Sequence, residues 1–68
     1  MVGVLGTVSS TIRPGGTGEM IFTQEGVRRG AAARNEDGTE LAVGTEVVVE
    51  RYEQAIAYVK RWDDLSQD

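Results

Sequence analysis

The stretch between the first two apolar runs is the most promising place for chemistry in this sequence. Residues 12–22 read IRPGGTGEMIF and contain three glycines and the only proline of the chain. Glycines with free N–H groups can wrap a phosphate. A P-loop, however, needs a lysine and a hydroxyl residue that lead into a helix. No lysine follows here, and Ile21 stands where the dinucleotide fingerprint GxGxxG needs a glycine. We therefore predict a sheet corner, with Pro14 and Gly15 in a type II turn.

No other set of residues has the spacing of a catalytic or metal site. The chain lacks cysteine and histidine, which excludes thiolate chemistry, imidazole bases and the usual zinc sites. Acid/base catalysis needs a buried carboxyl group, whereas Glu50 with Glu53 and Asp63 with Asp64 fall in positions that we expect to be wet. Three serines have no histidine to activate them, and the stretch 35–38 lacks most ligands of a calcium loop. We therefore predict no enzymatic activity, no cofactor, no metal and no small-molecule substrate.

Length and charge restrict the function further. The chain has 68 residues and a formal net charge of −4, so it forms one domain and is poorly suited to binding a polyanion. Arg28 and Arg29, with Arg13 and Arg34 near them in sequence, nevertheless keep single-stranded nucleic acid open as an alternative partner. No window approaches the roughly 18 to 20 apolar residues of a membrane span. We expect the chain to be soluble as it stands.

We predict five β-strands. In residues 2–12 the valines and Ile12 fall on even positions, which is the period of a strand, and Gly6 interrupts this series where we expect a bulge or bend. Turn residues at 14–18, 25–26, 35–38 and 42–45 separate the segments. The triple alanine 31–33 also fits a helix, but the neighbouring glycines leave too little length for one. The other four predicted strands are 19–24, 27–34, 46–52 and 56–62.

The last two strands form a predicted hairpin whose loop determines which side chains face outward. With a three-residue loop at Glu53–Ala55, the side chains of Val47 and Val49 share a face with Ala57 and Val59. A two-residue loop would exchange the faces, because one residue of slip inverts a strand. We favour the longer loop. It leaves an outward apolar stripe, which is a candidate contact site for a protein partner, and its residues are Val48, Tyr52, Ile56 and Tyr58.

Five short strands without a convincing helix or repeat predict an all-β domain, a small five-stranded barrel of the OB type. An SH3-like barrel is the alternative. Residues 1–62 form the barrel domain, and the acidic segment 63–68 is a tail that we expect to be frayed. Trp62 ends the last strand, where we predict that it covers one end of the core.

Read as a whole, the sequence resembles the C-terminal soluble domain of the NfeD family. The matching elements are GVLGTVSSTIRPGGTGEMIF, GVRRGAAARNEDGTELAVGTEVVV and IAYVKRW, which together span Gly3 to Trp62. The ordered features are a G-x-x-G-T-V opening, a proline-glycine corner, an alanine-rich strand and a glycine before the fourth strand.

This resemblance implies an OB-type barrel that is attached to membrane-spanning helices, which this chain lacks. Proteins of the family act with stomatin, prohibitin or flotillin-like partners at membranes, and some carry a separate serine-protease domain. No catalytic residue is transferred from the family to this chain. We therefore expect a non-enzymatic interaction module whose contacts lie on the outer stripe and, in addition, on Arg28 and Arg29.

Overall fold

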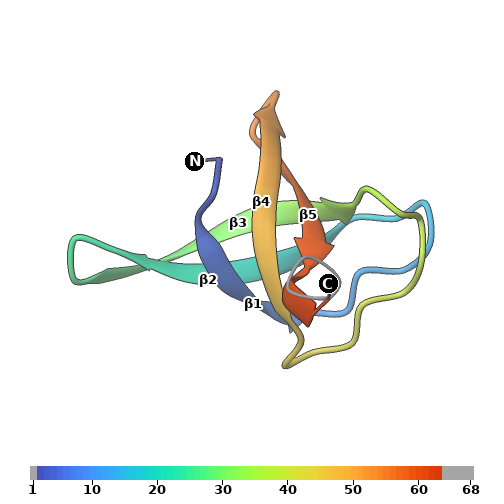
Figure 1. Ribbon diagram of the computed structural model, residues 1–68, viewed down its shortest axis with the longest axis horizontal. Helices are drawn as coiled ribbons and strands as arrows, with labels where there is room; N and C mark the ends of the chain where they lie inside the picture. Colours follow the sequence, from blue (N-terminus) through green and yellow to red (C-terminus); the bar gives the residue numbers. More distant parts are fainter. Residues whose placement is uncertain (1, 64–68) are drawn as a thin grey trace.

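The strands close into one barrel. The computed structural model describes residues 2–63, and its strands are Leu5–Ser10 (β1), Gly18–Gln24 (β2), Val27–Asn35 (β3), Glu46–Glu53 (β4) and Ile56–Arg61 (β5). Their order around the barrel is β1-β2-β3-β5-β4, as Figure 1 shows. Neighbouring strands are antiparallel except β3 and β5, which are parallel. Between these two in the sequence comes β4, which pairs with β1 and β5 and not with β3. This is the five-stranded OB-type barrel, so the predicted fold is confirmed over the SH3-like alternative.

The interior of the barrel is filled by apolar side chains. Alternate residues of β4 and β5 point inward, so that Val47, Val49, Ala57 and Val59 are each at most 1% exposed. Ile12 and Leu41 pair in an isolated bridge outside the strands, and both are buried. The buried cluster consists of Val8, Ile12, Met20, Phe22, Ala33, Leu41, Val47, Val49, Ala57 and Val59.

The first strand is confirmed, but its bulge does not lie at Gly6. The bulge lies at Ser9, where the pairing with β2 shifts between Val8 and Ser10. Gly6 is needed for close approach instead: an added Cβ would collide with the Met20 side chain and would lie 2.7 Å from the Ile21 carbonyl oxygen. The missing side chain at Gly6 therefore makes room for Met20, which is fully buried.

The predicted turns are confirmed. Gly16 N–H donates to the Arg13 carbonyl oxygen (2.8 Å) across Pro14 and Gly15, and Gly15 has a φ of 71°. This is the type II geometry that we predicted from the sequence. The turns at 35–38 and 42–45 are closed by the corresponding backbone hydrogen bonds. The triple alanine lies in β3, and the strand prediction was therefore right and the helical alternative wrong.

The β4–β5 hairpin differs from the prediction in a way that preserves its core. Glu53 pairs with Ile56, so the loop has two residues, Gln54 and Ala55, and the preferred three-residue loop was wrong. A bulge between Val49 and Arg51 then shifts the register by one residue. Because the loop and the bulge cancel, the four residues predicted to face the core still do so.

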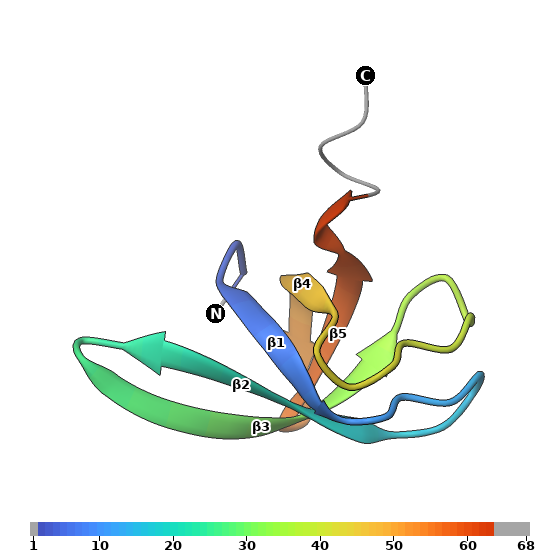
Figure 2. The ribbon, with the colours of Figure 1, turned by 90° about the horizontal axis from the view of Figure 1, so that it is seen from below.

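Strands β2 and β3 continue beyond the barrel as a two-stranded arm, which we call the β2–β3 arm (residues 22–31). β1 pairs with β2 only as far as Thr7 and Ile21, and β5 pairs with β3 only from Ala32 onward. Within the arm the two strands pair with each other alone, ending at Gln24 and Val27. The arm points away from the barrel in Figure 1 and in Figure 2.

Candidate functional site

The predicted outer stripe does not form one continuous apolar surface. Cross-strand partners project to the same side of a sheet, and Tyr52 pairs with Ala57, which is buried in the core. The assignment of Tyr52 to the outer face was therefore wrong, since the bulge at Glu50 inverts the faces of the following residues. Tyr52 lies near the loop and is 45% exposed. The structure thus separates Tyr52 from the other three stripe residues.

Those three residues lie on the outer face but are largely covered. Val48 is 7% exposed and has Leu5 and Lys60 as its cross-strand neighbours. Ile56 and Tyr58 are half-buried. The Arg51 guanidinium lies over the Tyr58 ring at 4.2 Å from its centroid, in cation–π geometry. This face therefore offers a partner little free apolar area.

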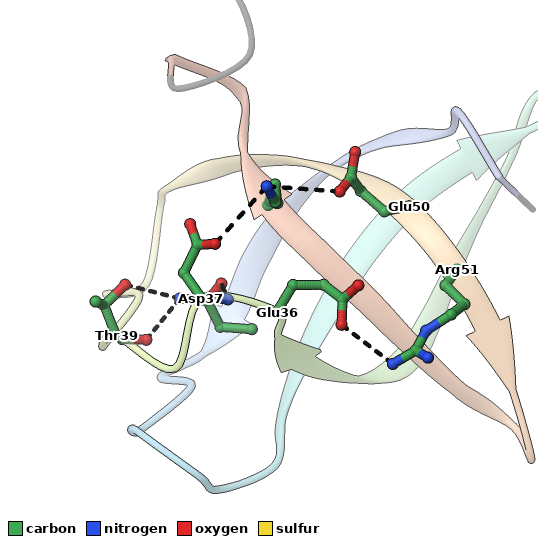
Figure 3. Close-up of polar contacts among 7 residues, drawn as sticks. Glu36, Asp37, Thr39, Glu50 and Arg51 are labelled. Atoms are coloured by element: carbon green, nitrogen blue, oxygen red, sulfur yellow. Dashed lines mark hydrogen bonds and ion pairs between the residues drawn. The ribbon is translucent and has the colours of Figure 1, made fainter.

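A set of ion pairs extends over the same face. Arg51 contacts Glu36 (3.1 Å) and Glu53 (3.7 Å), and Lys60 contacts Asp37 (3.8 Å) and Glu50 (3.9 Å), partly drawn in Figure 3. These contacts join the outer face of β4 and β5 to the turn after β3. We call this set the outer-face network. Sequence reasoning missed it, and the only available signal was the alternation of opposite charges along residues 50–53.

The turn that supplies Glu36 and Asp37 is held by Asn35. The Asn35 side-chain nitrogen donates to the Thr39 carbonyl oxygen (2.6 Å) and to its hydroxyl (2.9 Å), and the Asn35 side-chain oxygen accepts from Asp37 N–H (3.0 Å). Asparagine makes such local bonds readily in turns. The turn that carries Glu36 and Asp37 is therefore held by its own hydrogen bonds, and this supports the outer-face network.

Arg28 and Arg29 lie on the β2–β3 arm, and their charges are not used inside the domain. Both are exposed, and neither side chain forms an ion pair or hydrogen bond within residues 2–63. Arg28 pairs with Thr23 and Arg29 pairs with Phe22, so the two guanidinium groups point to opposite faces of the arm, as predicted. Nearby, Arg34 is occupied, because it donates to the Gly15 carbonyl oxygen (2.7 Å). The arm therefore carries two uncompensated positive charges.

An open cavity lies where β1 separates from the arm. Its volume is about 270 Å³, and Arg28 and residues 5–7 and 21–23 line it. Leu5, on its β1 side, is 55% exposed, and Val27 near the tip of the arm is 51% exposed. This part of the molecule thus combines free charge with free apolar surface.

The remaining candidates have structural explanations. Trp62 is 39% exposed and is not among the residues packed against the buried cluster, so the predicted lid over the core was wrong. Glu50 and Glu53 each face a cation, and Ser9 donates to Glu19 (3.1 Å). Within residues 2–63 no three acidic residues cluster as a metal site would require. Of the predicted tail, only Asp63 lies within the described residues.

No helix in the described part of the chain is both long enough and apolar enough to cross a membrane.

A search of curated proteins found no match. Two solved structures share the fold. The soluble domain of the NfeD protein YuaF from Bacillus subtilis has a TM-score of 0.78 and 25% identity, covering 88% of this chain and 71% of that one.

The second structure is the C-terminal domain of stomatin operon partner protein 1510-C from Pyrococcus horikoshii. It has a TM-score of 0.73 and 24% identity, and the match covers 90% of this chain and 86% of that one. At this identity it supports the barrel fold alone. A sequence model of the NfeD C-terminal domain matches residues 5–60, which include all but the last residue of the five strands. The chain therefore belongs to the NfeD C-terminal domain family.

Proposed function

We propose that this domain is a non-enzymatic protein-interaction module of a membrane-anchored parent protein, which acts with stomatin-, prohibitin- or flotillin-type scaffold proteins. One observation carries this proposal: the interior of the barrel is filled with apolar side chains, whereas its outer surface exposes apolar and charged side chains. Ten apolar side chains occupy the barrel, whereas exposed apolar groups and unpaired charges lie outside it. A barrel of this size has no room for a substrate pocket in its interior, so molecules must meet its outer surface.

Family membership agrees with this proposal. The Pyrococcus horikoshii neighbour is called a stomatin operon partner protein, and we extend that association to the present chain. Among the residues predicted to contact the partner, Tyr52, Arg28 and Arg29 are exposed. Val48, Ile56 and Tyr58 are already largely covered inside the domain and offer a partner less surface.

Binding of a purified stomatin-type protein from the same organism to the immobilised domain tests the proposal. Tyr52→Glu should weaken binding by about tenfold or more, since exposed tyrosines are frequent hot spots in interfaces. Val43→Glu is the matched control: Val43 is 60% exposed, lies in the 42–45 turn and receives the same charge. It should bind like the unmodified domain.

A second variant, in which Arg28 and Arg29 are both changed to Glu, should also weaken binding. Circular dichroism verifies that each variant is folded. If Tyr52→Glu and the double arginine variant are folded and both bind at the unmodified level, the proposed contact residues are wrong. If the unmodified domain does not bind the stomatin-type protein at all, the proposed class of partner is wrong.

A further inference from the structure

The β2–β3 arm has a free backbone edge along β3. Pairing with β5 begins at Ala32, and residues 27–31 have no strand on that side within the described part of the chain. All five residues are exposed or half-buried. Natural proteins usually protect such edges, because an unpaired edge is a template for another strand. An edge that remains open invites a partner in extended conformation.

The loop geometry identifies which backbone groups are free. The loop between β2 and β3 has two residues, Glu25 and Gly26, and the residues flanking such a loop, Gln24 and Val27, exchange hydrogen bonds with each other. Hydrogen-bonded pairs alternate along an antiparallel ladder. The N–H and C=O groups of Arg28 and Gly30 consequently point away from β2, toward the open edge. Gly30 has no side chain to obstruct an approaching backbone.

The charges at this edge select the type of strand that can bind. Arg28 and Arg29 are adjacent, are directed to opposite faces of the arm and form no ion pair in the described part of the chain. In an added strand, the two residues opposite them are also adjacent and also face opposite ways. One acidic side chain on each face would then meet one arginine, as charge-assisted hydrogen bonds require.

We propose that the β3 edge of the arm binds an extended acidic segment of a partner protein by strand addition, with two adjacent carboxylates paired to Arg28 and Arg29. This inference rests on the proposed function and names its mode of recognition. Backbone bonds from Arg28 and Gly30 supply affinity, and the two charges supply selection, as in other strand-addition complexes. A single strand of nucleic acid fits less well, since the arm has no exposed aromatic ring: Phe22, its one aromatic residue, is 7% exposed.

The probe for this inference is an acetylated, amidated peptide of sequence Thr-Val-Thr-Glu-Asp-Thr-Val-Thr. In titrations at low salt followed by ¹H–¹⁵N spectra, the amides of Arg28 and Gly30 should shift and gain protection from solvent exchange. A peptide with Lys-Lys in place of Glu-Asp should bind at least tenfold more weakly, because both charge pairs become repulsive. Equal binding of the two peptides would overturn the proposal.

A proline pair tests the edge itself. Gly30→Pro removes one outward N–H and places a ring at the edge without breaking the ladder to β2, and it should weaken binding about tenfold or more. Thr23→Pro is the matched control, since Thr23 is the cross-strand partner of Arg28 and its N–H points to the other edge of the arm. An equal loss in both prolines would overturn strand addition at β3.

A charge exchange keeps the inference testable if proline at Gly30 prevents folding. The double change Arg28→Glu and Arg29→Glu should reverse the preference, so that the Lys-Lys peptide binds more tightly than the acidic one. Failure to reverse the preference would overturn the proposal, as would tighter binding of a ten-nucleotide oligothymidine than of the acidic peptide.

If the stomatin-type protein binds but the acidic peptide does not, only this inference fails. If the peptide binds at the edge but the stomatin-type protein does not, only the proposed partner fails.

Discussion

The two hairpins of this barrel have the same loop length but different surroundings. Each is closed by two residues with positive φ, Glu25 and Gly26 in one and Gln54 and Ala55 in the other. The β4–β5 hairpin is bulged and its outer charges are paired in the outer-face network. The β2–β3 hairpin instead runs out of the barrel, and within residues 2–63 its β3 edge has no neighbouring strand and its two arginines form no ion pair. The outer charges of the β4–β5 hairpin are therefore paired within the domain, whereas the two arginines of the β2–β3 arm are exposed.

The largest expected effect concerns the base of the arm. Phe22→Ala should lower the free energy of unfolding by about 3 to 5 kcal/mol, because Phe22 is the core residue from which the arm extends. Val27→Ala, near the tip, should change it by less than about 0.5 kcal/mol, since Val27 is 51% exposed. Urea denaturation followed by circular dichroism measures both. Comparable losses would mean that the tip is also packed and that the arm is not a free element.

The loops differ in the residue that must adopt a left-handed conformation. Gly26 takes its φ of 76° without steric cost, whereas Ala55 has a φ of 64°. Ala55→Gly should therefore stabilise the domain by about 1 kcal/mol, and Gly26→Ala should destabilise it by a similar amount. Thermal unfolding of the two variants compares them directly. Destabilisation by Ala55→Gly would contradict the two-residue loop of the β4–β5 hairpin.

The smallest expected effect compares one arginine from each hairpin. Arg51→Ala removes contacts with Glu36, Glu53 and the Tyr58 ring, and it should cost about 1 kcal/mol at low salt, less at high salt. Arg28→Ala should leave stability within about 0.5 kcal/mol, since Arg28 has no charge partner among residues 2–63. Urea denaturation at two salt concentrations provides the measurement. A larger loss at Arg28 than at Arg51 would reverse the comparison of the hairpins.

Local patterns were sufficient to predict most of the fold. Alternation located the first strand, turn residues delimited the other four, and Pro14 with Gly15 located the first corner. The faces of Val47, Val49, Ala57 and Val59 were also predicted correctly, although through a wrong loop length that the bulge at Glu50 cancelled. The candidate site was less predictable. Arg28 and Arg29 were identified and their opposite directions confirmed, but the face of Tyr52 and the covered state of Val48 were not foreseen.

The sequence by itself determined the period-two strands, the turns between them and the apolar residues of the core, because these depend on the conformational preferences of neighbouring residues. Only the tertiary structure decided which surface charges form ion pairs and which backbone edges pair with another strand. Arg51 meets Glu36 across 15 positions of sequence, and the free edge of β3 exists because β5 joins only at Ala32. Both depend on register between distant strands, and a single bulge changes that register without altering the pattern of residues.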